Sequence, residues 1–404
     1  MRSALRSLSF RRLAAALAVS QCGDWLYNVA LLVFVFDRTH SVLWVSITTA
    51  VRVLPIVVLG PLGGALADRF DRRRLMILAD VVRAALMLLL TVVVTTGAPV
   101  VLAPVLAGLA TAASIAYPPA TAASTPKLVP AADLPGANAV RSVIGAASVL
   151  GGPAIGALLL ALTNPASLFA INAGTFVLSA LLVAAIPAGP AFAPAGSAGA
   201  DPLLRQLADG LRELRRHPVA ARFVGADILC SVLYGAETVL LVLVSRQDGW
   251  GDHGYGLLLA ATGAGGVIGT ALVSRLGRFS RVSRVVAIAL LAAGAPLALM
   301  AAVPTLALAL VLCALNGAGA IVVEVFTETA LQQQLDEAVF GRAYGFAFPA
   351  SIGGIAVGSL IAAPLAGLLG LGGALTALAV GVSLYAAVLL IARRAPRMAA
   401  VPAT

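Results

Sequence analysis

The residues of this sequence best suited to chemistry are charged side chains inside long apolar stretches. Asp24 and Arg52 each lie about 11 residues from the end of such a stretch, near the middle of a membrane at about 1.5 Å per residue. A charge at that depth costs about 2.5–3.5 kcal/mol on insertion scales. We therefore predict an Asp24–Arg52 pair facing a central cavity, with Asp24 as the proton-binding group and Asn28 as a substrate contact one turn away.

The chemistry of Asp24 depends on two opposing effects. Burial in a low-dielectric region favours the neutral acid, whereas a neighbouring guanidinium favours the carboxylate. A carboxyl group balanced between these effects can bind a proton in one conformation and release it in another. The alternative is a permanent ion pair that only fixes the packing of the helices.

A second set of polar residues lies in the apolar stretch around residue 230. Asp227, Ser231 and Tyr234 recur at i, i+4 and i+7, so they share one face of a helix. Such a stripe faces a cavity or hydrogen-bonds to a neighbouring helix. Glu237 lies further along the same stretch and is the second candidate for protonation or for cation binding.

The other charges at membrane depth have simpler explanations. Asp80 and Arg83 are three residues apart and share a helix face, which favours a structural ion pair. Arg141 lies near the inner end of its stretch, where a long side chain can reach the membrane surface. We therefore expect structural roles for all three residues.

The elements that position these residues must be membrane helices. Only 11% of the residues are charged and 60% are hydrophobic, whereas an average globular domain has about 25% and about 45–50%. Each span needs about 20 mainly apolar residues. Twelve stretches meet this requirement, at about 13–36, 41–66, 75–96, 99–122, 138–162, 166–187, 219–245, 253–274, 283–300, 303–326, 342–366 and 370–392.

Arginines are concentrated at alternate connections between these stretches. One side carries clusters such as those at 2–12 and 69–74, whereas the other side carries only Arg38 and Arg246. The positive-inside rule therefore places both termini in the cytoplasm. We predict an all-α integral membrane protein with 12 transmembrane helices in two six-helix bundles.

The chain divides into two halves of similar size around a break rich in proline and glycine. We predict a first bundle over 1–187, a cytoplasmic linker over 188–218, and a second bundle with a short cytoplasmic tail over 219–404. Leucines and arginines at helical spacing indicate a short amphipathic helix in the linker. This helix lies on the inner leaflet of the membrane, or it is a solvated connector.

Several function classes are excluded by what the sequence lacks. It has no P-loop, no metal-ligand cluster and no soluble catalytic domain, so we expect no enzyme, cofactor or metal. The net charge of +10 comes from arginines beside apolar segments, which argues against nucleic acid as a partner. The three cysteines are too far apart for a metal site. The expected partners of this monomer are lipid, protons and a small-molecule substrate.

The loop between the second and third stretches has a distinctive pattern. Gly64, Asp68, Arg69 and Arg72 follow the helix 2–3 loop signature of the major facilitator superfamily, which this loop resembles, and Asp71 replaces a usual glycine. The resemblance implies a conformational lock in which Asp68 holds the inner helix ends together. A degenerate copy of the pattern recurs about 206 residues later, as in a fold built from parallel repeats.

Two further segments favour an exporter. Gly152, Pro153 and Gly156 resemble the helix 5 motif of antiporters in this superfamily. The segment 117–138 resembles the helix 4–5 connection of the branch that contains enterobactin exporters and macrolide efflux proteins. The fourth stretch lacks the arginine motif of drug antiporters, so proton coupling is expected to depend on Asp24 and its partner.

Together these features predict a secondary active efflux transporter of a bacterial plasma membrane. The expected mechanism is alternating access, with proton-coupled antiport of a small lipophilic compound, an antibiotic or a secreted metabolite. The alternatives are an importer of a small metabolite and a non-transporting membrane scaffold or sensor. An importer should require one defined substrate, whereas an exporter of lipophilic compounds should accept several.

Overall fold

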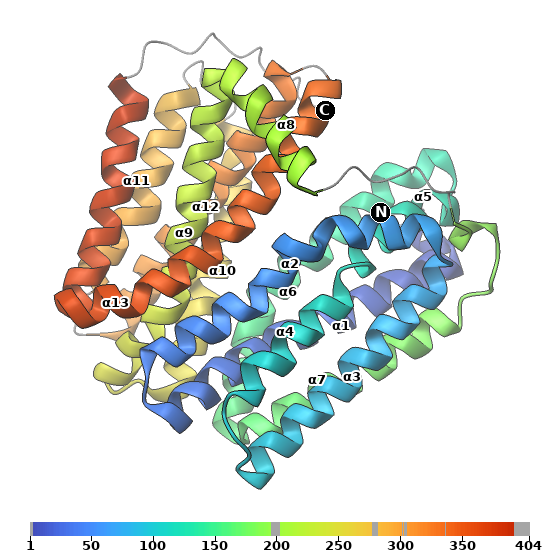
Figure 1. Ribbon diagram of the computed structural model, residues 1–404, viewed down its shortest axis with the longest axis horizontal. Helices are drawn as coiled ribbons and strands as arrows, with labels where there is room; N and C mark the ends of the chain where they lie inside the picture. Colours follow the sequence, from blue (N-terminus) through green and yellow to red (C-terminus); the bar gives the residue numbers. More distant parts are fainter. Residues whose placement is uncertain are drawn as a thin grey trace. The chain divides into compact units, whose positions relative to one another are not determined.

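The computed structural model describes residues 3–194, 203–276, 282–300, 302, 305–335 and 337–391. Every regular element in these ranges is a helix, in agreement with the predicted all-α class (Figure 1). The chain forms two compact units, which are described one at a time. The first contains Met1–Trp44 and Val51–Ala200, and the second contains Val45–Ala50 and Asp201–Thr404.

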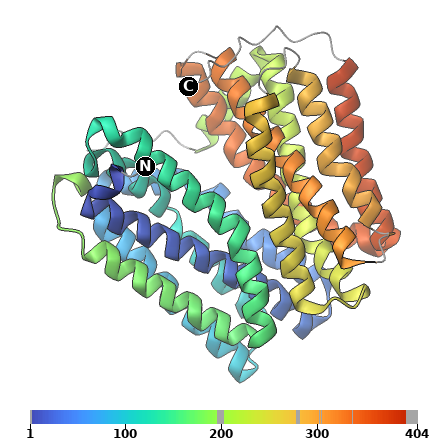
Figure 2. The ribbon, with the colours of Figure 1, turned by 180° about the vertical axis from the view of Figure 1, so that it is seen from behind.

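The first unit is a bundle of long helices. They are α1 (Leu8–Thr39), α2 (Val42–Arg69, apart from Val45–Ala50), α3 (Arg72–Thr96), α4 (Leu102–Ser114), α5 (Tyr117–Leu128), α6 (Leu134–Leu162) and α7 (Pro165–Ala184). α1 packs against both α6 and α7, and α3 packs along α7. Figure 2 shows α1, α6 and α7 towards the viewer, in dark blue to green.

Local signals in the sequence set the ends of these helices. The Ser7 side chain accepts a hydrogen bond from the Phe10 backbone nitrogen and caps α1. Asp71 Oδ1 accepts one from the Arg74 backbone nitrogen at 2.8 Å and caps α3. The cap explains why an aspartate replaces glycine in the loop signature, because glycine has no side-chain oxygen to accept this bond.

The second unit is also helical throughout its described residues. It contains α8 (Leu203–Arg216), α9 (Pro218–Gln247), α10 (Gly251–Leu276), α11 (Val282–Met300), α12 (Leu306–Gln334) and α13 (Glu337–Ile391). α9 packs along α13, and α10 packs along α12. Within α13, Gly370 has φ 70° and ψ 172°, which is not helical, so two helical segments meet there.

Ten helical segments of the described residues are long and apolar enough to cross a membrane. One of them, Leu102–Leu128, is interrupted between α4 and α5, where Pro118 lies in the first turn of a new helix. Another, Phe346–Ile391, is 46 residues long and includes Gly370. The count of twelve spans and the cytoplasmic location of both termini stay predictions.

The predicted linker is described in part. Its first residues form a short 3-10 helix, Pro190–Phe192, and Phe192 is buried in the core of the first unit. Residues 195–202 lie outside the described part of the chain. In the amphipathic α8, Leu214 is buried against the ends of α12 and α13. The described apolar end of α8 therefore packs against protein. The predicted division of the chain into two bundles and a linker stays a prediction.

Candidate functional site

The first unit contains a polar cavity of about 510 Å³, within the usual range of about 300–1,000 Å³ for small-molecule sites. Side chains from α1, α3, α4, α5 and α6 line it. Its charged lining residues are Asp24, Arg83 and Arg141. The segment 117–138 contributes Tyr117 and other lining residues, so the branch-specific part of the sequence borders the cavity.

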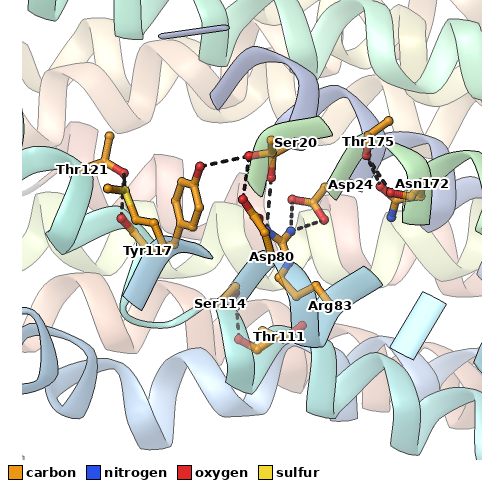
Figure 3. Close-up of polar contacts among 12 residues, drawn as sticks. Ser20, Asp24, Asp80, Arg83, Thr111, Ser114, Tyr117, Thr121, Asn172 and Thr175 are labelled. Carbon is orange, nitrogen blue, oxygen red and sulfur yellow. Dashed lines mark hydrogen bonds and ion pairs between the residues drawn. The ribbon is translucent and has the colours of Figure 1, made fainter. Parts of the chain in front are cut away.

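Asp24 on α1 forms an ion pair with Arg83 on α3 (Figure 3). Arg83 Nη2 donates to Asp24 Oδ1 at 2.6 Å and to Oδ2 at 2.5 Å. Arg83 is 5% exposed, whereas the Asp24 side chain is 38% exposed. The pair therefore presents mainly its acidic member to the cavity.

Arg83 has further partners that fix its position. Its Nη1 donates to Ser20 Oγ at 3.1 Å and lies 3.5 Å from Asp80 Oδ1. Its guanidinium carbon lies 3.8 Å from the centre of the Phe176 ring, a cation–π contact. One guanidinium therefore joins α1, α3 and α7 and serves two carboxylates.

A chain of hydroxyl groups connects Asp80 to the cavity wall. Asp80 is fully buried, and its Oδ2 accepts a hydrogen bond from Ser179 Oγ at 2.6 Å. Because Ser179 donates its single hydroxyl proton to Asp80, the Tyr117 hydroxyl must donate to Ser179, at 3.2 Å. Tyr117 lines the cavity, so Asp80 is linked to it through two hydroxyl groups.

The network of Asp24, Asp80 and Arg83 is suited to bind one proton. With both carboxyl groups ionised, the three side chains carry a net charge of −1, and one added proton makes them neutral. Either protonation state leaves Arg83 with at least one carboxylate, so neither state leaves a bare guanidinium.

The predicted exporter motif positions the helix that carries Asp24. A Cβ atom on Gly152 of α6 would lie 2.2 Å from the Cβ of Trp25, and one on Gly156 would lie 3.4 Å from Leu26 Cα. Pro153 lies between these glycines inside the same helix. Small residues therefore let α6 approach α1 directly beside Asp24.

The predicted Asp24–Arg52 pair is wrong, because Asp24 is paired with Arg83. Arg52 instead lies near the Tyr27 side chain, and Arg52 Nε is buried without a partner in the described residues. Asn28 is 3% exposed and its Oδ1 also lacks a partner there. Residue counting estimates depth along a helix, but the face on which a side chain lies decides its partner.

Two further residues belong to the site although sequence reasoning assigned them elsewhere. Arg83 was expected only as the structural partner of Asp80, and Arg141 was expected at the membrane surface. The structure places both in the cavity wall. A usable signal for this wall was the polar stripe of Ser20 and Asp24, which are four residues apart on α1.

The predicted lock residues lie around the end of α2 and the start of α3. Arg72 is 3% exposed, and it lies 3.5 Å from Asp68 while its Nε donates to the Ala67 carbonyl oxygen at 3.0 Å. Arg69 is exposed and contacts the ring of Phe70, the residue after it. The Asp68 side chain is 49% exposed, so it is the accessible member of its ion pair.

The glycines of the same loop differ in their packing. A Cβ on Gly63 would lie 2.2 Å from the Ile115 carbonyl oxygen, whereas one on Gly64 would meet nothing within 4 Å. Gly63 is therefore the glycine that close packing requires. Arg278, which belongs to the weaker copy of the loop, lies outside the described residues.

In the second unit, the predicted residues of α9 lie in two separate environments. Asp227 Oδ2 accepts a hydrogen bond from Ser351 Oγ at 2.5 Å, and Tyr234 is half-buried further along the helix. Glu237 is 2% exposed and contacts Thr262 on α10. Asp227 and Glu237 are about 15 Å apart along the axis, so they do not form one site. Among the described residues no group of metal-ligating side chains is found.

Comparisons with known proteins identify relatives of the whole chain. The family model for transmembrane secretion effectors, a family of the major facilitator superfamily (MFS), matches residues 2–403. The MFS-type transporter YfiS of Bacillus subtilis is 30% identical over 65% of this chain, and the match spans 63% of YfiS, just under two thirds. The multidrug efflux pump Tap of Mycolicibacterium fortuitum is 26% identical over 86% of this chain and 87% of Tap.

Two other comparisons agree. The enterobactin exporter EntS of Shigella dysenteriae is 28% identical over 87% of this chain and 84% of EntS. The crystal structure of the nucleoside transporter NupG superposes with a TM-score of 0.74 at 14% identity, covering 95% of this chain and 98% of NupG, which shows a shared fold. The chain therefore belongs to the transmembrane secretion effector family of the major facilitator superfamily, and is a multi-pass transporter of the bacterial inner membrane rather than an enzyme.

Proposed function

We propose that this transporter exports a small organic compound in exchange for protons, by alternating access, with the cavity of the first unit on the transport path. The observation that carries the proposal is the shared guanidinium: Arg83 contacts two carboxylates, and one of them, Asp24, borders the cavity. The names of two relatives, an efflux pump and an exporter, support the outward direction.

Protonation of Asp24 changes the contacts of Arg83. A salt bridge requires the ionised carboxylate, so a proton on Asp24 weakens its attraction to Arg83. Arg83 then keeps Asp80 as its charged partner. The contact between α1 and α3 loosens at the cavity, and the network changes from a net charge of −1 to neutral. Proton binding can thereby shift the conformational equilibrium of the unit.

An ion gradient is the proposed source of energy. Moving one charge through 100 mV is worth about 2.3 kcal/mol, enough to shift a conformational equilibrium by more than tenfold. The sequence contains no nucleotide-binding loop that would point to ATP instead.

The other predicted residues have proposed roles in the same cycle. Asp68 is half-exposed beside Arg72, so it can exchange this partner for another group when the helix ends move. We assign Asp68 and its arginines to a conformational lock. Asp227 and Tyr234 of the second unit are assigned to the substrate path.

The test is uptake into everted membrane vesicles from efflux-deficient bacteria, with a panel that includes macrolides and siderophores. Wild-type vesicles should accumulate at least one compound when energised, and a protonophore should abolish this uptake. Asp24→Asn should remove the gradient-dependent part. The matched control is Asp209→Asn, which breaks an ion pair of 2.6 Å with the largely exposed Arg212 on α8 and should transport normally.

Three results would contradict parts of this proposal. Uptake by Asp24→Asn that still depends on the gradient would exclude Asp24 as the coupling group. Accumulation in intact cells instead of everted vesicles would show import. Normal transport by Asp68→Asn, with folded protein in the membrane, would exclude Asp68 from a conformational lock.

A further inference from the structure

The cavity of the first unit has one charged lining residue without an ion-pair partner in the described part of the chain. Arg141 on α6 is half-buried, its Nε is shielded from solvent, and it makes no hydrogen bond or ion pair within the described part of the chain. The other two charged lining residues, Asp24 and Arg83, are paired with each other. Arg141 is therefore the uncommitted charge of this site.

A structural role does not account for Arg141. Two buried arginines of the same unit have clear partners: Arg83 contacts two carboxylates, and Arg72 contacts Asp68 and a backbone carbonyl. Arg52, like Arg141, has a buried Nε without a partner in the described residues, but of these two only Arg141 lines the cavity. Asp24 is paired with Arg83 through both of its oxygens, and no hydrogen bond or ion pair joins it to Arg141 in the described part of the chain. A guanidinium held in a largely apolar bundle without an anion is costly, so a ligand that supplies the anion would be bound favourably.

The neighbours of Arg141 add neutral hydrogen-bonding groups at the same wall. Asn138 lies one turn earlier on α6, Ser142 is the next residue, and both are exposed and line the cavity. A guanidinium matches the two oxygens of a carboxylate better than any other side chain does. Amide and hydroxyl groups beside it can bind the remaining polar atoms of an acid.

We propose that Arg141 binds an anionic group, a carboxylate or a comparable acid, of the transported compound. The substrate class assigned to this cavity is therefore an organic acid, with or without a further polar part. This assignment rests on the proposed function, because it names what the cavity of the exporter accepts. It is separate from the proton network, which lies at Asp24, Asp80 and Arg83.

The assignment has a consequence for energetics. Export of a monovalent anion in exchange for one proton moves two units of positive charge inward. The inside-negative membrane potential therefore assists the exchange, in addition to the pH gradient. Export of a neutral compound in the same exchange would move only one unit.

The experiment uses the full chain in lipid nanodiscs and two xanthene dyes of similar shape. Fluorescein is the acid, and rhodamine 123, in which a methyl ester replaces the carboxylate, is the cation. Fluorescence anisotropy at one pH, without a gradient, gives the dissociation constants. Wild type should bind fluorescein, and Arg141→Gln should weaken this binding about tenfold or more. Arg141→Lys should retain part of it. The control Arg215→Gln removes an exposed charge on α8 and should bind as wild type does.

Opposite results overturn the assignment. It is wrong if wild type does not bind fluorescein, if it prefers rhodamine 123, or if Arg141→Gln binds fluorescein unchanged. A folded state of each variant is checked by its elution and melting profile. Because binding is measured without a gradient, Asp24→Asn can lose coupled transport while fluorescein binding persists, so failure of the coupling mechanism and failure of the substrate class are distinguished.

Discussion

The two units of the molecule bury carboxyl groups in opposite ways. In the first unit, Asp24 and Asp80 share the cation of Arg83, and Asp24 borders a polar cavity. In the second unit, Glu237 is 2% exposed and contacts neutral groups, the Thr262 hydroxyl at 3.3 Å and the Asn316 side chain. The first arrangement can change its charge and remain paired, whereas the second is suited to a single neutral state.

Thr262 indicates why Glu237 should hold its proton. The Thr262 hydroxyl lies 3.2 Å from the Leu258 carbonyl oxygen and 3.3 Å from Glu237 Oε1, but it has one proton to donate. If Glu237 donates to Thr262, then Thr262 can donate to Leu258 and both contacts are satisfied. An ionised Glu237 would be a charge among neutral groups, which is far more costly.

The packing around the two acids differs as much as their charge. A Cβ on Gly317 of α12 would lie 1.9 Å from the Thr262 carbonyl oxygen, and one on Gly265 of α10 would lie 1.8 Å from that of Ala314. α10 and α12 are thus in backbone contact beside Glu237, which leaves little room for water. In the first unit, by contrast, Asp24 borders the cavity.

The largest expected effect comes from removing the shared cation. Arg83→Gln leaves Asp24 and Asp80 without a charged partner, and breaking a buried pair in this way costs about 3–5 kcal/mol. We expect a much lower melting temperature for the purified protein. Adding Asp24→Asn should restore part of the loss, because it removes one unpaired charge. If Arg83→Gln alone is as stable as wild type, the Arg83 cation does not stabilise the two carboxylates of the first unit.

An intermediate effect is expected from Gly317→Ala in the second unit. Its Cβ would force the backbones of α10 and α12 apart at Thr262, at a cost of about 1–3 kcal/mol. The control is Gly353→Ala on α13, where a Cβ meets nothing within 4 Å and alanine should stabilise the helix by about 0.5–1 kcal/mol. Equal melting temperatures for the two variants would show that the packing beside Glu237 is loose.

The smallest expected effect comes from Glu237→Gln. A glutamine amide can donate to Thr262 and accept from Asn316, as the neutral acid does, so the free energy of unfolding should change by less than about 1 kcal/mol. Gradient-driven transport should also be kept. If transport is lost while the melting temperature is unchanged, Glu237 is a second coupling group. Each unit would then contain a carboxyl group that takes part in proton coupling.

Much of the fold was accessible from the sequence because its signals are local. Apolar length and low charge predicted membrane helices, and described helices occupy most of each predicted stretch. The loop signature and the segment 117–138 predicted the superfamily and its branch, which the family comparison confirms. Asp24 was identified because a lone carboxyl group in an apolar helix is conspicuous.

Only the tertiary structure decided which side chains meet. Arg83, rather than Arg52, pairs with Asp24, and Arg141 lines the cavity of the first unit. Both outcomes depend on the rotation of each helix about its axis and on close approaches such as that of Gly152 to Trp25. A sequence encodes position along a helix directly, but the direction of a side chain relative to other helices is set by the packing of the whole bundle.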